Sequence, residues 1–183
     1  MDRCKDRVER EESLQKEITL CPCKIWENLK NNPKMILIFL ILSVCVVWID
    51  QEIKKIILDG FRYQGDVISI VYILNNGVAF SMFEFLGEWL KWIQLAFVML
   101  LGYGVLASKD LLKNHVLEFA LIVGSGASNL YDRFVVGGVV DYVYWHYGFE
   151  FAIFNFADVM INLGIAIFIL KLLFQKKTPS PSV

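Results

Sequence analysis

The sequence has few of the residues that usually hold metals or cross-link small domains. It contains two histidines and four cysteines among 183 residues, and three of the cysteines precede residue 24. Cys21-Pro22-Cys23 can bind a metal or become oxidised, but it lacks the second pair of ligands that a zinc site needs. We therefore interpret this cysteine pair as incidental and expect no metal site.

Charge is scarce beyond the N-terminal region, although the formal net charge is only -1. Charged residues crowd residues 1–34, and Asp2 to Glu17 is mostly charged. This extension has too little apolar surface to form a core, so we expect a flexible cytoplasmic segment over 1–34. Residues 35–177 then form one bundle, and the proline-containing tail 178–183 is expected to be disordered. No basic surface suggests a nucleic-acid partner.

Apolar residues dominate the rest of the chain. The hydrophobic fraction is 56% and the mean hydropathy is +0.51, which is typical of an integral membrane protein. A bilayer core of roughly 30 Å needs about 20 apolar residues per helix. Four segments approach this length and predict four spanning helices: Met35 to Ile49 with apolar residues resuming at Ile56, Trp89 to Ala107, His115 to Tyr131, and Phe151 to Leu170. The first is too long for a cleavable signal segment.

Lysine and arginine near the ends of these helices predict their orientation. Basic residues precede the first helix, separate the second from the third, and follow the fourth: Lys24, Lys30, Lys34, Lys109, Lys113, Lys171, Lys176 and Lys177. Both termini are then cytoplasmic. This topology puts His115 and His146 on opposite sides of the membrane, so we expect no cofactor bound between them.

The polar residues next to the apolar runs sort to the outer side of the membrane under this topology. They are Asp50 and Lys54 at the end of the first helix, Asn75 in the first outer loop, Asn129, Asp132 and Arg133 at the end of the third helix, Asp141 in the second outer loop, and Asp158 two turns into the fourth helix. The segment from Phe61 to Phe83 is rich in β-branched and aromatic residues and predicts a strand or hairpin on the same surface.

Two carboxylates stand out in this group. Asp158 lies in an otherwise uncharged run, where an ionised side chain is costly and usually functional. When two carboxylates share a site, one pKa rises strongly, which leaves an acid and a base near neutral pH. Asp141 and Asp158 are therefore candidates for activating water. The alternative is that Asp158 is a packing residue paired with Arg133 and that Asp141 is an ordinary loop residue.

Five short sequence motifs, which follow one another along the chain, support this interpretation. They are Asp50-Gln51-Glu52-Ile53-Lys54, Asn75-Asn76-Gly77-Val78-Ala79-Phe80-Ser81, Asn129-Leu130-Tyr131-Asp132-Arg133, Gly138-Val139-Val140-Asp141-Tyr142, and Phe154-Asn155-Phe156-Ala157-Asp158. With the four-helix pattern, they make residues 34–177 resemble the lipoprotein signal peptidase (signal peptidase II) family. The resemblance implies an all-α membrane protein with four transmembrane helices and a small β cradle on the outer surface.

The resemblance also implies an activity in the bacterial inner membrane. It is that of an intramembrane aspartyl peptidase, which removes the signal peptide from prolipoproteins just before a diacylglyceryl-modified cysteine. Membrane lipids surround the enzyme, and cyclic peptides of the globomycin type are expected inhibitors. Asp141 and Asp158 match the catalytic pair. The residues that match the polar lining of the substrate site are Asn75, Asn129, Arg133 and Asn155.

Three further residues match positions near the site. Asp50 and Lys54 are spaced i, i+4 with the acid first, so they can pair on one helix face and shape the site. Asp132 is expected to orient Arg133. The chain departs from the family pattern at Ser125, Ser128 and Tyr142, none of which is in the dyad.

Two other functions compete with the peptidase. Intramembrane carboxylates also mark ion pathways, but a carrier usually has an internal repeat and midplane charges; this chain has neither. A noncatalytic scaffold would need no convergence of polar residues. The small residues from Gly124 to Ser128 favour close helix packing, whichever function applies.

Overall fold

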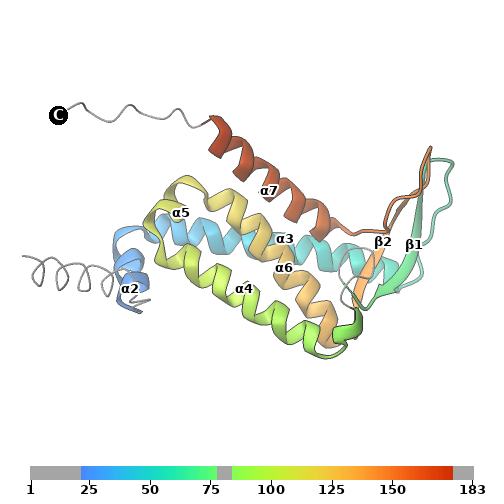
Figure 1. Ribbon diagram of the computed structural model, residues 1–183, viewed down its shortest axis with the longest axis horizontal. Coiled ribbons are helices and arrows are strands. Elements are labelled where there is room, and N and C mark those ends of the chain that lie inside the picture. The colour runs from blue at the N-terminus through green and yellow to red at the C-terminus, as the bar shows by residue number, and fades with distance from the viewer. Residues whose placement is uncertain (1–21, 78–83, 175–183) are drawn as a thin grey trace, which may run out of the picture.

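The computed structural model describes residues 22–77 and 84–174. Over these residues the chain forms four long helices, three short ones and a two-stranded sheet (Figure 1). The helices are α2 (Pro22–Asn31), α3 (Pro33–Leu58), η2 (Glu84–Leu86), α4 (Trp89–Ala107), α5 (Lys109–Asn114), α6 (Val116–Val135) and α7 (Phe156–Phe174), and the strands are β1 (Ile68–Asn75) and β2 (Val139–Trp145). Figure 1 shows the sheet at one end of the bundle and α2 and α5 at the other.

Helix α3 is longer than the first apolar run. Pro33 lies at its first positions, where a missing N–H is tolerated, and the helix continues past Ile49 to Leu58. The polar interruption after Ile49 does not end it, because Asp50 and Lys54 form an i, i+4 ion pair that is buried within the protein. The expected pairing of these two residues is therefore confirmed, but the helix ends at Leu58, about one turn beyond Lys54.

Three helices are long and apolar enough to cross a membrane among the residues described: α3, α4 and α7. The expected bounds of α4, Trp89 to Ala107, are confirmed. Helix α6 has 20 residues but is less apolar than these three, since it carries small, amide and charged side chains. These residues are largely buried, because α6 packs against α3, α4 and α7.

The small residues of α6 allow one very close helix contact. A Cβ atom added at Gly124 would lie 2.7 Å from the carbonyl oxygen of Ser43 in α3. Backbone approach of this kind is what small residues provide in membrane bundles. The segment is not used for packing alone, because Ser128 also donates a hydrogen bond to Asp50.

The sheet joins two segments that are far apart in the sequence. Strand β1 lies within the segment expected to contain a strand or hairpin, and Tyr63 forms a local antiparallel bridge with Ile70 of the strand. Strand β1 pairs antiparallel with β2, in a register that sets Ile73 opposite Asp141 and Asn75 opposite Val139. The prediction that Asp141 lies in a loop is thus wrong. Gly137, at φ +90°, makes the turn between α6 and β2 in a conformation that favours glycine.

Helix α7 begins later than the apolar run suggests. Residues 151–155 approach it in an irregular path in which Phe154 bridges to Val143 of β2, and the helix starts at Phe156. Asp158 therefore lies in the first turn of α7, not two turns inside it. The helix continues to Phe174, beyond the expected end at Leu170.

The N-terminal extension contains a docked helix. The side chain of Asn28 in α2 is buried and donates a hydrogen bond to the carbonyl of Leu106 in α4. This contact is polar, so the low apolar content of the extension did not predict it. The flexibility expected for residues 1–34 stays a prediction. Residues 1–21 and the tail 178–183 lie outside the described residues, and their assignment stays a prediction.

Replacing Gly124 by alanine should destabilise the bundle by about 1–3 kcal/mol, because the added methyl group would force α3 and α6 apart. Gly104→Ala in α4 is the matched control, since nothing lies within 4 Å of its added Cβ. That control should be neutral or slightly stabilising, because alanine favours a helix over glycine. Thermal unfolding in detergent measures both; equal shifts would contradict the proposed close contact.

Candidate active site

Lys54 of α3 lies at the centre of a buried polar network. Its side chain is 1% exposed, and its Nζ lies 2.6 Å from Asp50 Oδ2 and 2.7 Å from Asp132 Oδ2. Nζ also donates a hydrogen bond to Asn129 Oδ1 at 2.8 Å. An ammonium group has three hydrogens to donate, so this group is fully satisfied. The contacts tie α3 to α6.

Asp50 extends this network to the start of α7. Its Oδ1 accepts a hydrogen bond of 3.0 Å from the backbone N–H of Ala157, in the first turn of that helix. Its Oδ2 accepts a hydrogen bond from Ser128. A carboxylate at a helix N-terminus satisfies a free N–H group and interacts favourably with the helix dipole. Asp50 thus fixes the end of α7 that carries Asp158.

Asp132 does the same for strand β2. Its Oδ2 accepts a hydrogen bond from the backbone N–H of Val140, the residue before Asp141. Its Oδ1 accepts a hydrogen bond from Gln51 at 2.8 Å. The contacts of its carboxylate are therefore with α3 and β2. The expectation that Asp132 orients Arg133 finds no support in these contacts.

Asn155 and Asp158 cap the N-terminus of α7 together. The backbone N–H of Asp158 donates to Asn155 Oδ1 at 2.9 Å, and the backbone N–H of Asn155 donates to Asp158 Oδ2 at 3.1 Å. This reciprocal pair is a capping box. The other carboxylate oxygen of Asp158 accepts a hydrogen bond from Asn129 of α6 at 3.0 Å. The Asp158 carboxylate is thus held in place by a backbone N–H of its own helix turn and by a side chain of the neighbouring helix.

Asp141 projects from β2 and is 2% exposed. Its Oδ2 accepts a hydrogen bond from Asn75 of β1 at 2.9 Å, and its Oδ1 accepts one from Asn155 at 2.7 Å. Burial raises the pKa of Asp141 to about 6; the Asn75 hydrogen bond opposes this rise, and the charge of Asp158 adds to it. The carboxyl group can therefore exchange a proton near neutral pH.

The Asn155 side chain connects the two carboxylate environments. Its amide nitrogen donates to Asp141 and to Asn129 Oδ1, while its oxygen accepts from the N–H of Asp158. The residue is fully buried. Asp141 and Asp158 therefore belong to one hydrogen-bonded network, although 17 positions separate them in the sequence.

Arg133 occupies another wall of the same site. Its guanidinium donates hydrogen bonds to Gln94 of α4 at 2.7 Å and to the carbonyl of Gly77. Gln94 in turn donates to the carbonyl of Gly126. Among the described residues no ion pair joins Arg133 to Asp158, so the packing alternative for Asp158 is not what the contacts show. The sequence analysis did not identify Gln94, because it is a single polar residue in an apolar helix and belongs to no sequence motif.

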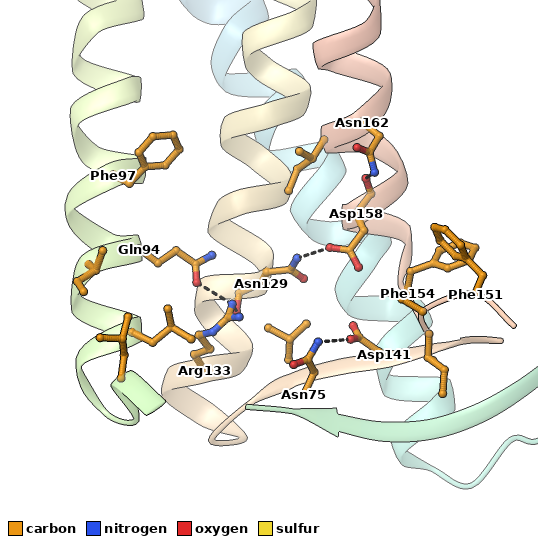
Figure 2. Close-up of a pocket in the computed structure, with 17 residues that line it drawn as sticks. Asn75, Gln94, Phe97, Asn129, Arg133, Asp141, Phe151, Phe154, Asp158 and Asn162 are labelled. Atoms are coloured by element: carbon orange, nitrogen blue, oxygen red, sulfur yellow. Dashed lines mark hydrogen bonds between the residues drawn. The ribbon is translucent and has the colours of Figure 1, made fainter. Parts of the chain in front are cut away.

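A cavity of about 790 Å³ opens between α4, α6, α7 and β2. Figure 2 shows Asp141 and Asp158 on one side of it and Gln94 with Arg133 on the other. Its remaining wall is mainly apolar, formed by residues that include Leu86, Leu90, Ile93, Phe97, Ile161 and Phe154. An apolar cavity with a few convergent polar groups is the usual form of a binding site. Two carboxylates in such a cavity can exchange protons with a bound reactant.

Helices long and apolar enough to cross a membrane, together with a cavity lined by two carboxylates, define a class, a membrane protein with a candidate acid–base site. A family profile described as Signal peptidase (SPase) II matches residues 42–174. The chain belongs to the signal peptidase II family, and membership implies a protease.

Relatives in several bacteria agree with this assignment. The lipoprotein signal peptidase of Helicobacter pylori (strain Shi470) is 49% identical over 149 residues, which cover 81% of this chain and 95% of the relative. That of Wolinella succinogenes is 50% identical over 136 residues, 74% of this chain and 93% of the relative. That of Campylobacter jejuni (serotype O:23/36) is 46% identical over 134 residues, 73% of this chain and 86% of the relative.

Two solved structures share the fold, and both are described as bacterial membrane enzymes. The first, at 2.3 Å resolution, has a TM-score of 0.68 and 24% identity, and covers 79% of this chain and 93% of that chain. The second, at 1.9 Å resolution, has a TM-score of 0.65 and 24% identity, with coverage of 75% and 94%.

Replacing Lys54 by methionine should destabilise the protein by about 3–5 kcal/mol, because it leaves the carboxylates of Asp50 and Asp132 buried without their cation. Lys55→Met is the matched control, since Lys55 is the next residue and is exposed. Thermal unfolding in detergent measures the difference. Equal stability of the two variants would show that the buried ammonium does not organise the site.

Asp141→Asn should stabilise the protein at pH 8 but not at pH 4. The pKa of the Asp141 carboxyl is raised in the folded state. Its ionisation therefore does not affect the folding stability below the pKa of the unfolded chain, and it lowers the folding stability as the pH rises from there through about 6. The wild type should therefore lose up to about 3 kcal/mol relative to the variant over this interval. Unfolding measured across the same pH range tests this; a difference that does not change with pH would contradict it.

Proposed function

We propose that this protein is an endopeptidase that cleaves the signal peptide from diacylglyceryl-modified bacterial prolipoproteins, just before the lipidated cysteine. Asp141 and Asp158 are its catalytic residues, and water activated by them is the nucleophile. The observation that carries the proposal is that both carboxylates line one cavity and are linked through Asn155. The printed names of the relatives, lipoprotein signal peptidase, support the substrate class.

The proposed reaction uses one ionised and one protonated carboxyl group. The ionised carboxylate accepts a proton from water as the water oxygen bonds to the peptide carbonyl carbon. The protonated carboxyl donates its proton to the carbonyl oxygen, which gives a tetrahedral intermediate. The carbon–nitrogen bond then breaks as the first carboxyl donates its proton to the leaving nitrogen. The second carboxylate takes a proton back from a hydroxyl group of the intermediate, which re-forms the carbonyl and restores the starting protonation of the pair. Each aspartate acts as acid and as base within one turnover.

The asparagine side chains of the site position the catalytic carboxylates and are less suited to direct contact with the substrate. Asn75, Asn129 and Asn155 each donate a hydrogen bond from their amide nitrogen to a catalytic carboxylate or to another member of the network. Such bonds hold the two carboxylates in one geometry before substrate arrives. Arg133 lines the cavity across from them and is the remaining candidate for binding the substrate backbone.

The cavity suits a substrate that is partly lipid. Its wall includes Ile93, Phe97 and Ile161 from helices that also face the bilayer. An acyl chain or the apolar part of a signal peptide can occupy such a wall while the scissile peptide lies over the carboxylates. Cyclic peptides of the globomycin type would compete for the same volume. No cofactor takes part in this scheme.

We propose that α6 is the fourth membrane span. Its charged ends are matched within the protein: Glu118 pairs with Lys171 of α7 at 2.7 Å, and Asp132 pairs with Lys54. Polar residues in a spanning helix are tolerated when they face the bundle and find partners. Four spans return the chain to its starting side, which is cytoplasmic by the lysine distribution. The sheet and the carboxylates then face the outer side of a bacterial inner membrane.

Asp141→Asn and Asp158→Asn should each abolish cleavage while the protein stays folded and inserted. Asparagine retains the size and part of the hydrogen bonding but cannot take up or release the proton, so we expect a loss of about 10²- to 10⁴-fold or more. Asp59→Asn is the matched control, because Asp59 is exposed at the end of α3. Turnover of a lipid-modified precursor by purified variants measures the effect; wild-type turnover by either dyad variant would refute the mechanism.

The substrate assignment needs a separate experiment. Purified protein in detergent, with a chelator and without any ion gradient, should cleave a diacylglyceryl-modified precursor and leave the same precursor uncleaved when its cysteine is unmodified. A carrier would show no cleavage under these conditions. Equal cleavage of both precursors would keep the peptidase but remove the proposed requirement for the lipid.

A further inference from the structure

Helix α2 lies at the end of the bundle opposite to the sheet (Figure 1), and it exposes apolar side chains. Trp26 is 62% exposed and Leu29 is 43% exposed. With 3.6 residues per turn, these two residues and Lys30 lie on one side of the helix, while Asn28 lies on the other. Asn28 is the residue that docks on α4, so the exposed face points away from the bundle.

The position of α2 is set by two membrane-crossing helices. It ends at Asn31, two residues before α3 begins at Pro33. Through Asn28 it is attached to Leu106, the penultimate residue of α4. One span therefore starts beside α2 and another ends beside it. With both helices spanning the membrane, as proposed above, α2 lies at the depth where the hydrocarbon core meets the headgroups.

The same end of the protein carries exposed basic side chains. Lys30 and Lys34 are exposed at the junction of α2 and α3, and Lys109 and Lys113 are exposed on α5. The ammonium group of Lys30 lies 5.0 Å from the ring centre of Trp26, so a positive charge accompanies the exposed aromatic ring. Glu27 and Asp110 are the exposed acids on these two short helices.

We propose that α2 is an interfacial helix that binds the anionic phospholipid headgroups of the bilayer surface. Tryptophan is favoured at the boundary between headgroups and hydrocarbon, and a helix with one apolar face and basic residues lies in that plane. Near an anionic membrane each lysine contributes a factor of about five in binding. The adjoining apolar span makes a lipid surface, in preference to a soluble protein, the occupant of this face.

Hydrogen exchange of the α2 backbone in the full-length protein tests the proposal without any use of catalytic activity. The protein is placed in lipid nanodiscs of phosphatidylcholine, with and without phosphatidylglycerol. Exchange over residues 22–31 should be several-fold slower when phosphatidylglycerol is present, and high salt should remove the difference. Exchange that is equal in the two lipids would overturn the proposal.

Two sets of variants separate lipid binding from docking on α4. Lys30→Gln with Lys34→Gln leaves the apolar face and the Asn28 contact in place, so it should remove the dependence on phosphatidylglycerol while α2 stays helical. Trp26→Ser with Leu29→Ser should speed exchange in both lipids. Glu27→Gln, on the same helix, is the control and should preserve protection. If the lysine variant kept the full dependence on anionic lipid, the headgroup site would be wrong.

Discussion

The buried ammonium group of Lys54 is the interaction on which the rest of the site depends. It forms ion pairs with both Asp50 and Asp132, which are buried from water. Each of those carboxylates then holds a different element, because Asp50 binds the start of α7 and Asp132 binds the backbone of β2. One cation on α3 thus sets the positions of the helix and the strand that carry the two proposed catalytic residues.

The four aspartates of the site divide into two kinds by their partners. Asp50 and Asp132 each form an ion pair with Lys54. Asp141 and Asp158 accept hydrogen bonds from neutral amides, and in the described residues neither forms an ion pair. A carboxyl group without a cation can gain or lose a proton at moderate cost. The proposed catalytic carboxylates therefore lie near the two that are paired with Lys54, but they differ from them in their hydrogen-bond partners.

The sequence predicted those parts of the molecule that depend on local pattern. Apolar runs predicted α4 to the residue, and the i, i+4 spacing predicted the Asp50–Lys54 pair. Long-range contacts were not predictable in the same way. The pairing of β1 with β2 joins segments more than 60 residues apart, and Asp132 contacts Lys54 across the bundle instead of its neighbour Arg133. Helix α7 starts at Phe156, after the capping box, and not at Phe151 where the apolar run begins, because hydrophobicity alone does not mark a helix boundary.

The pH dependence of cleavage tests most directly whether two carboxyl groups share the chemistry. It requires kcat/KM for a lipid-modified precursor from about pH 4 to about pH 9, with the fold monitored at each pH. We expect a maximum with a fall on both sides, because the pair is active only with one proton bound and loses activity when it carries two protons or none. A rate that stays constant over this range, in protein that remains folded, would contradict the two-aspartate mechanism.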